Sequence, residues 1–346
     1  MSADPITALV ILNYNGRSYL ERFLPSVIQH SPHGTHFVVG DNASTDDSID
    51  FIKTNYAQIQ VVQLEKNYGF AEGYNQVLRQ VHASFYFLLN SDVELRSTWA
   101  PLLNAMQQDT LLAACQPKIL SYHQPEYFEH AGAAGGWMDI LGYPLCMGRI
   151  LDHFEKDGGQ YDLAREIFWA SGAAMMVRAS IFHDLGGFDG AYFAHMEEID
   201  WCWRAKRCGY SIKSIPQTAV YHIGGGTLPY HSNRKIFLNF RNNLATILKN
   251  ESALKLVYLI PLRFVLDGLA AMVFLLKGNI KGFLAVMHAY LSVLSWIPDI
   301  ITKRKSTNRL AALKTFNQSG VFKGSLLFHY FILGHKRFNQ LVITHA

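Results

Sequence analysis

Charged residues and cysteines are scarce in this 346-residue sequence. Asp, Glu, Lys and Arg make up 17% of the chain and hydrophobic residues 49%, which excludes a disordered protein. The four cysteines form no C-x-x-C pair, so no redox or zinc motif of that spacing is present. The first residues have no basic stretch followed by an apolar core and a cleavage site. We therefore expect a reducing, cytoplasmic environment and no cleaved signal.

Acidic and basic residues are unevenly distributed along the chain. Residues 1–232 contain 15 Lys and Arg against 24 Asp and Glu, a net charge of −9, whereas residues 233–346 contain 16 against 3, a net charge of +13. This asymmetry predicts two modules that face different partners. The basic half is rich in Leu, Ile, Val and Phe, which favours an anionic membrane surface as its partner and no nucleic acid.

Short apolar runs alternate with segments of helical periodicity. Strands are expected at 6–12, 36–39, 59–64 and 85–90, and helices between them at about 17–31, 47–56 and 71–81. A less regular excursion follows at 115–165, and then strands at 168–178 and 211–223 and helices at 179–188 and 197–210. This order predicts an α/β fold with a Rossmann-like, mostly parallel sheet and flanking helices.

Polar residues follow several of the apolar runs, at the edge where an open parallel sheet binds its ligands. The first candidates for a binding site are Asn13, Asn15, Asp41, Asn42, Asn90 and Asp92. The segment 67–75 adds glycines, which permit close backbone approach, and a helix start whose amides favour anions. The segment 41–46 has a second explanation, because Ser, Thr and Asp side chains also cap helices.

Asn90 and Asp92 place two side-chain oxygens on one side of an extended turn. Mg²⁺ and Mn²⁺ prefer oxygen ligands and commonly keep waters and substrate phosphates, so the pair fits a cation that bridges a diphosphate. An isolated Asp after a strand is also a common turn residue. His222 precedes the glycine run 224–226 and is a candidate metal or phosphate contact, or a structural histidine. Nearby cations able to neutralise a diphosphate are Arg234, Lys235 and Arg241.

The segment HMEEIDWCWR at 195–204 places Glu197, Glu198 and Asp200 beside apolar side chains. Burial and like charge both raise carboxyl pKa values, which suits a base that works near neutral pH.

The rest of this segment is expected to support the acids. Asp200, Trp201 and Arg204 are candidates for orienting the helix or binding an acceptor. Of Trp201 and Trp203, we expect one in the core and at most one near an acceptor sugar.

Two long apolar segments follow at 254–278 and 282–298. The first is near the ~20 residues that span a bilayer, but Pro261, Arg263 and Asp267 interrupt it. Arg263 and Asp267 are four residues apart and can pair on one helical face. Two interpretations remain open, a pair of spanning helices or helices that lie in the membrane interface. The flanking lysines and arginines favour the interfacial one for the region 254–301.

Six motifs together resemble glycosyltransferase family 2, whose members have the GT-A fold, and among these the rhamnosyltransferase-like members. They are VILNYNG (10–16), GDNASTDDS (40–48), NYGFAEGYN (67–75), LLNSDVEL (88–95), GGFDGAYFAHMEEIDWCWRAKRCGY (186–210) and VYHIGGGTL (220–228). The resemblance implies an inverting transfer of a sugar from a nucleotide-diphosphate sugar to a saccharide acceptor in cell-surface polysaccharide synthesis. A lipid-linked acceptor would explain the basic, apolar tail.

The resemblance also implies roles for individual residues. Asp41 contacts the nucleoside, Asn90-x-Asp92 occupies the D-x-D position with Asp92 on Mg²⁺ or Mn²⁺, and Glu198, next to Glu197, occupies the position of the acceptor-activating Asp. With Asn90 at the first place of that motif, we expect His222 to be the second protein ligand of the ion. Residues expected to bind the nucleotide sugar are Asn13, Asn15, Asp41, Asn42, Asn67, Gly69, Asn75 and Asn90. Asn90 and Glu198 depart from the Asp that the family has at these positions.

The expected organisation is a GT-A glycosyltransferase domain at 1–232 and a basic helical region at 233–346 that associates with the cytoplasmic side of the cell membrane. Two alternatives come from other classes. A nucleotidyltransferase would have a Gly-rich loop with Lys or Arg after the first strand, where NYNGRSYL has one glycine. A non-catalytic sugar-nucleotide-binding or scaffold protein would explain Asn90 and Glu198 as decay, which the retained Asp41, Asp92 and His222 argue against.

Overall fold

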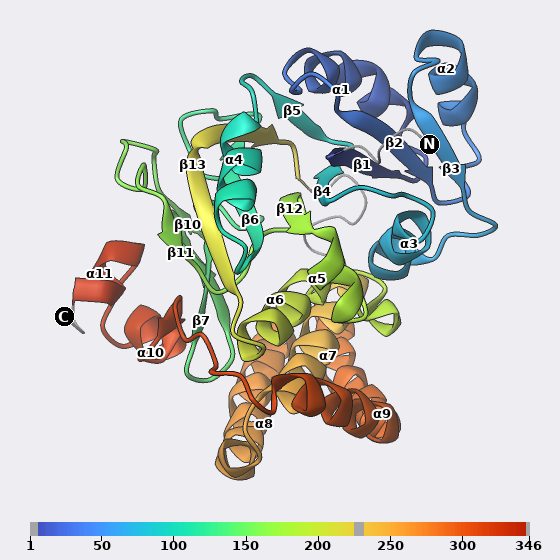
Figure 1. Cartoon of the computed structure of the whole chain (residues 1–346). Helices are drawn as coiled ribbons and strands as arrows, with labels where there is room; N and C mark the ends of the chain where they lie inside the picture. The colour runs from blue at the N-terminus through green and yellow to red at the C-terminus, as the bar shows by residue number, and fades with distance from the viewer. Residues whose placement is uncertain (1–5, 225–231, 344–346) are drawn as a thin grey trace.

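The computed structural model describes residues 6–224 and 232–343, and Figure 1 shows the course of the chain. Gly225 and Gly226 of the glycine run, with the end of the motif at 220–228, lie outside the described residues.

A large mixed sheet forms the centre of the fold. Within the described residues it has nine strands in the order β11-β13-β6-β12-β4-β1-β2-β3, with β5 paired to β13. Their bounds are β1 Thr7–Asn13, β2 His36–Asp41, β3 Gln60–Gln63, β4 Phe85–Asn90, β5 Val93–Leu95, β6 Leu112–Ser121, β11 Arg165–Glu166, β12 Ala174–Arg178 and β13 Ser211–His222. The expected strands of the first 90 residues are all present.

Parallel pairing aligns the polar strand ends. β1 lies between β2 and β4 and is parallel to both, with Asn13 opposite Asp41 and Leu12 opposite Asn90. The candidate polar residues therefore meet at one edge. β12 runs antiparallel to both β4 and β6, so the sheet is mixed rather than parallel throughout. The strand expected at 168–178 begins only at Ala174, and the residues before it form a loop.

Helices cover both faces of this sheet. One face packs against α1 Arg17–Gln29, α2 Ser48–Asn55 and α4 Ala100–Gln108, and the other against α3 Gly69–Leu78, α5 Ala179–Asp184 and α6 Glu197–Arg207. The 3-10 turn η1, Gly190–Tyr192, precedes α6. Each helix buries the apolar stripe that its periodicity predicts, as α1 does with Leu20, Phe23, Leu24 and Val27.

A second, smaller sheet occupies much of the irregular excursion. Its order is β10-β9-β8-β7-β14, with bounds β7 Gly136–Asp139, β8 Pro144–Cys146, β9 Arg149–Ile150, β10 His153–Phe154 and β14 Val321–Phe322. β14 comes from the end of the chain and pairs in parallel with β7. The short helices α10 Leu326–Phe331 and α11 Phe338–Ile343 follow it, on the same side of the molecule as β7 in Figure 1.

Three long helices lie together at one end of the molecule (Figure 1). They are α7 Asn233–Asn250, α8 Ala253–Leu276 and α9 Ile280–Ala311. Side chains of Ser232, Ser252 and Asn279 cap their N-termini. By length and composition, α8 and α9 are long and apolar enough to cross a membrane, with mean hydropathy 2.0 and 1.5 in their best windows. Their outward surfaces carry exposed apolar residues such as Leu254, Leu269, Leu291 and Leu294.

The ion pair expected within α8 is present and buried. Arg263 Nη2 lies 3.2 Å from Asp267 Oδ2, and the two residues are only 1% exposed. The hydroxyls of Tyr143 and Tyr290 donate to the two Asp267 oxygens at 2.8 and 2.7 Å. Arg263 also donates to the Leu141 carbonyl at 3.0 Å and to the Asn243 side chain at 2.7 Å. This network joins α8 to α7, α9 and the loop of the second sheet.

Removing one member of this network should destabilise the fold strongly. We expect Asp267→Ala to lower the free energy of unfolding by about 3–5 kcal/mol, because it leaves the Arg263 charge buried without its carboxylate. The matched control is Asp299→Ala in α9, whose carboxylate is 52% exposed and whose loss should cost less than about 1 kcal/mol. Urea unfolding followed by circular dichroism measures both, and equal losses would contradict the structural role of the network.

Candidate active site

A cavity of about 800 Å³ opens at the polar edge of the large sheet. Twelve of the residues predicted from the sequence line it: Asn13, Asn15, Asn42, Asn67, Gly69, Asn90, Asp92, Glu197, Glu198, His222, Arg234 and Lys235. The loop before β12 and residues of α7 complete its wall. The motifs at 10–16, 40–48, 67–75, 88–95 and 186–210 therefore converge on one space.

Asparagine side chains order one end of the cavity. Asn13 Nδ2 donates to Asp41 Oδ1 at 3.0 Å, and the Ser44 amide donates to Asp41 Oδ2 at 2.9 Å. Asn42 donates to Asn67 Oδ1 at 3.1 Å and to the Gly69 carbonyl at 2.9 Å. Asp41 itself is buried and does not line the cavity, so it acts here by orienting Asn13 and the following turn. Its contact with a nucleoside stays a prediction.

Asn75 requires a correction, because the structure does not bring it into the cavity. Its Nδ2 donates to the Phe188 carbonyl at 2.9 Å, and the Phe188 amide donates to its Oδ1 at 3.0 Å. Asn75 is buried and fixes the backbone between α5 and η1 to helix α3. Asn75 is the last residue of the motif at 67–75, and on α3 its side chain is buried in the protein and does not line the cavity.

Asp92, His222 and Glu129 form a hydrogen-bonded line at the sheet edge. His222 Nε2 lies 3.1 Å from Asp92 Oδ1, and His222 Nδ1 lies 3.1 Å from Glu129 Oε2. Burial acts to lower the pKa of His222, but the two carboxylates outweigh it and raise the pKa to about 10. Burial acts to raise the pKa of Glu129, yet the hydrogen bond and charge of His222 lower it to about 2.

This donor set fits a divalent ion that keeps substrate oxygens as further ligands. Asp92 and His222 both line the cavity, and Asn90 Nδ2 lies 3.4 Å from His222 Nε2. Asp92 would supply an oxygen, and His222 would supply a nitrogen once the ion displaces the proton that the two carboxylates hold on the imidazole. Glu129 binds the far nitrogen of the imidazole, as the outer carboxylate of a metal-bound histidine does. In the described part of the chain, no group of three or more His, Cys, Asp or Glu forms a complete cage. Phosphates and waters would complete the coordination.

Glu197 and Glu198 face the cavity at the N-terminus of α6. Glu197 is buried and Glu198 half-buried, and one oxygen of each, Oε2, has no hydrogen-bond partner among the described residues. Burial raises the pKa of Glu198 to about 7, and burial together with the charge of Glu198 raises the pKa of Glu197 well above its ordinary value. Near neutral pH the two glutamates therefore share a proton. The glutamate that is ionised can accept a second proton from a ligand.

The supporting residues of α6 are structural. Asp200 is fully buried and accepts from Arg204 Nε at 3.0 Å, Lys249 Nζ at 2.9 Å and Asn250 Nδ2 at 2.8 Å. Arg204 also donates to the carbonyls of Leu185 and Gly187. These contacts orient the helix, one of the two roles expected of them, and neither residue lines the cavity.

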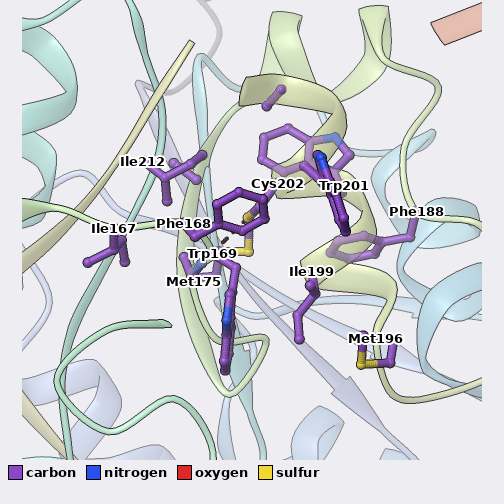
Figure 2. Packing of buried hydrophobic residues seen from close by; sticks show 14 of the residues in the cluster. Ile167, Phe168, Trp169, Met175, Phe188, Met196, Ile199, Trp201, Cys202 and Ile212 are labelled. Carbon is purple, nitrogen blue, oxygen red and sulfur yellow. Dashed lines mark hydrogen bonds between the residues drawn. The ribbon is translucent and has the colours of Figure 1, made fainter. Parts of the chain in front are cut away.

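Trp201, expected either to support α6 or to bind an acceptor, lies in the core. Figure 2 shows Trp201 inside the cluster of buried hydrophobic residues, with Phe188 and Cys202. Trp201 is 0% and Trp203 only 5% exposed, and they pack against the rings of Phe182 and Phe168. Both tryptophans are therefore core residues, because adjacent elements cover both sides of α6.

Basic residues from distant segments also line the cavity. They are Arg149 of β9, Arg234 and Lys235 of α7, and Arg263 of α8. Burial and the charge of Lys235 lower the pKa of His195 to about 4, so this cavity-lining histidine is neutral. Arg241, another expected phosphate contact, instead binds the Ala191 and Tyr192 carbonyls and does not line the cavity. The 1–232 and 233–346 division stays a prediction, but both halves build this site.

Comparison with known families agrees with this geometry. The sequence model described as "Glycosyl transferase family 2" matches residues 8–186, more than half of the chain. The chain belongs to glycosyl transferase family 2. It is therefore a glycosyltransferase with the GT-A fold, as its motifs predicted, and the nucleotidyltransferase alternative is excluded.

Individual relatives of this glycosyltransferase are distant. The N-acetylglucosaminyl-diphospho-decaprenol L-rhamnosyltransferase of Mycobacterium tuberculosis is 24% identical over 240 residues, which cover 63% of this chain and 76% of the relative. The solved mannosyltransferase PcManGT of Pyrobaculum calidifontis, in complex with GDP-Man and Mn²⁺, has a TM-score of 0.51 at 14% identity, covering 90% of this chain and 87% of its own.

A second solved structure, GalNAc-T7 with UDP, GalNAc and Mn²⁺, has a TM-score of 0.55 at 16% identity. The match covers 72% of this chain and 48% of GalNAc-T7, so this glycosyltransferase spans about half the length of that protein. At these identities both structures show a shared fold.

Glu129 is the site residue that sequence reasoning missed. It lies in the excursion at 115–165, where no periodicity indicated an element, and it reaches His222 across 93 positions of the chain. The available signal was an acid next to His130, directly before the Gly- and Ala-rich stretch 131–136.

The raised pKa of Glu198 predicts the pH dependence of the glycosyltransferase. A base must be deprotonated, so turnover should rise about 50-fold from pH 5 to pH 7 and level off above about pH 8. Rates of nucleoside diphosphate release between pH 5 and 9 measure this, with donor affinity followed over the same range as control. A flat profile from pH 5 to 7 would contradict it.

The raised pKa of Glu198 also makes the stability of the fold depend on pH. The folded-state pKa of this carboxyl lies above its unfolded value, so its contribution to stability is lost as pH rises through about 7. Glu198→Gln, which cannot ionise, should therefore melt at a higher temperature than the wild type at pH 8 but not at pH 5.

Proposed function

We propose that this glycosyltransferase moves a sugar, with inversion, from a nucleotide-diphosphate sugar to a saccharide acceptor, which is lipid-linked, in cell-surface polysaccharide synthesis. One observation carries the proposal: the Asp92–His222 pair lines the same cavity as Glu198, whose Oε2 has no hydrogen-bond partner among the described residues. The first suits a bound diphosphate and the second suits the activation of a hydroxyl.

The donor fits the end of the cavity that Asn13, Asn42 and Asn67 order. Amide side chains and free backbone groups at strand ends recognise nucleosides by hydrogen bonds. From there the diphosphate reaches Asp92 and His222, and the positively charged side chains of Arg234 and Lys235 line the same cavity. The two Mn²⁺-containing structural neighbours support Mn²⁺ or Mg²⁺ as the ion at this position. When bound, the ion would neutralise negative charge on the leaving diphosphate.

Glu198 is the proposed general base. An acceptor hydroxyl attacks the anomeric carbon from the face opposite the diphosphate, and its proton passes to a Glu198 oxygen. The bond between the anomeric carbon and the diphosphate oxygen breaks, and its electron pair leaves with the nucleoside diphosphate. A single displacement of this kind inverts the anomeric centre. Arg234 and Lys235 stabilise the charge that develops on the departing phosphate.

The proposed acceptor and location rest on the C-terminal helices. The relative from Mycobacterium tuberculosis has a name that specifies a diphospho-decaprenol substrate, a lipid. In this chain, α8 and α9 expose apolar residues, including Val257, Leu269, Leu291 and Leu294, and basic residues flank them. We propose that these helices lie in the cytoplasmic interface of the cell membrane, where lysines and arginines each gain roughly 1 kcal/mol from anionic lipid.

A donor panel tests the catalytic proposal. We expect nucleoside diphosphate release with one nucleotide sugar, Mn²⁺ or Mg²⁺ and a polyprenyl-diphosphate-linked sugar. Glu198→Gln should lower kcat by about 10²–10⁴-fold and leave donor affinity nearly unchanged, because it removes the base but not the donor contacts. The control is Glu126→Gln, an exposed carboxylate that does not line the cavity. Donor binding without release for every pair of substrates would instead favour a scaffold.

Vesicle flotation tests the location. The double variant Leu269→Asp and Leu291→Asp, at sites 59% and 65% exposed, should lose flotation with anionic vesicles while staying folded. The control, Leu163→Asp in the N-terminal half, is 74% exposed and should float like the wild type. Resistance of the wild-type protein to extraction at alkaline pH would show spanning helices instead of interfacial ones.

A further inference from the structure

The backbone just before the catalytic acids is held in a sparsely populated conformation. Phe193, His195 and Met196 have φ values of 66°, 69° and 75°, in the left-handed region that side chains larger than glycine seldom adopt. Such residues persist only where surrounding contacts over-determine them, and they concentrate at functional sites. This turn is followed immediately by Glu197 and Glu198, the first two residues of α6.

Asn242 of α7 supplies a concentrated set of contacts to this turn. Its Nδ2 donates to the carbonyls of Tyr192, Ala194 and His195 at 3.1, 2.9 and 2.8 Å. Asn242 is 0% exposed, so water does not compete for these bonds. An amide nitrogen has two hydrogens, and the three carbonyls share them.

The orientation of the Asn242 amide is determined by its other end. Oδ1 accepts a hydrogen bond from Arg241 Nε at 2.9 Å, and a guanidinium can only donate. The nitrogen must therefore face the turn. Arg241 Nη2 adds a bond to the Tyr192 carbonyl at 3.0 Å and packs over the ring of Trp296 in α9.

Hydrogen bonds connect the 193–196 turn to helix α6, so the conformation of the turn determines the direction of Glu197 and Glu198. The Asp200 amide donates to the Met196 carbonyl at 2.8 Å, so the first turn of α6 starts from the left-handed residue itself. On the other side, the amides of Phe70 and Ala71 donate to the Phe193 carbonyl at 2.6 and 3.2 Å. Rotation of the peptides at 193–196 toward ordinary φ values would redirect Glu197 and Glu198, because both lie within two residues of Met196.

We propose that Asn242 is a positioning residue for the catalytic reaction: its amide holds the 193–196 turn in the left-handed conformation that aims Glu198 into the cavity. This inference rests on the proposed role of Glu198 as base. Because Asn242 belongs to α7, this proposal gives the basic C-terminal region a role in catalysis in addition to the proposed membrane contact. Asn242 does not line the cavity, so its effect on turnover passes through the turn.

The test compares Asn242→Asp and Asn242→Ala with Ile247→Ala in full-length protein. Asn242→Asp keeps the shape but replaces the donor by an acceptor that faces three carbonyls. Ile247 is also 0% exposed on α7 and has no hydrogen bond to the turn, so it reports the effect of simply loosening this helix. The measurements are kcat, KM for the acceptor, donor affinity, the pH profile, and hydrogen exchange of peptides covering 190–200.

We expect both Asn242 variants to lower kcat by at least about 100-fold, with donor affinity changed less than about threefold. Exchange should rise in peptides covering 190–200, and the midpoint of the pH profile should move to lower pH as the carboxylates gain water. Ile247→Ala should lose thermal stability but keep the midpoint. Wild-type turnover in either Asn242 variant, or unchanged exchange at 190–200, would overturn the proposal.

The experiment separates this inference from the function on which it rests. If Glu198→Gln stays active while both Asn242 variants lose turnover and gain exchange, Glu198 is not the base, and Asn242 positions a different group on the same turn. If Glu198→Gln is inactive while the Asn242 variants match the wild type, the base assignment stands and the positioning role fails.

Discussion

Within the described residues, no lysine or arginine forms an ion pair with Glu197 or Glu198, and the chemistry of the active site depends on this arrangement. Two adjacent carboxylates in a poorly hydrated place repel each other and resist ionisation, and a lysine or arginine nearby would remove that effect. Cations are abundant in the surroundings, yet Lys249, Lys303 and Arg204 bind Asp189 and Asp200 instead. These cations neutralise the buried carboxylates of Asp189 and Asp200. Glu197 and Glu198, which line the cavity, keep raised pKa values.

This division of charge changes the meaning of the basic C-terminal half. From composition it is a membrane-seeking tail, and its exposed apolar helices still support that interpretation. Several of its cations, however, point inward: Arg263 is buried with Asp267, and Lys249 with Asp189 and Asp200. The excess of positive charge therefore stabilises the catalytic half as well as favouring an anionic surface.

The pattern of apolar and polar residues in the sequence was sufficient to predict the parallel part of the sheet and the residues at its edge. Buried strands read as continuous apolar runs, and parallel register then carries Asn13, Asp41 and Asn90 to one place without further information. What the sequence could not show depends on contacts between distant segments. Asn75 was assigned to the ligand space, and the role of Trp201 was left open, because the direction of a side chain on a helix depends on what covers that helix. Glu129 and Asn242 were missed because their partners lie 93 and about 50 positions away.

The pairing of β14 with β7 imposes an order on biosynthesis. β7 ends at Asp139, but its partner strand begins at Val321, and the intervening stretch includes the whole α8–α9 hairpin. At translation rates of roughly 5–20 residues per second, the edge of β7 waits roughly 10–40 s for its partner. The apolar hairpin leaves the ribosome within that interval. The second sheet is therefore completed only after the α8–α9 hairpin has been synthesised.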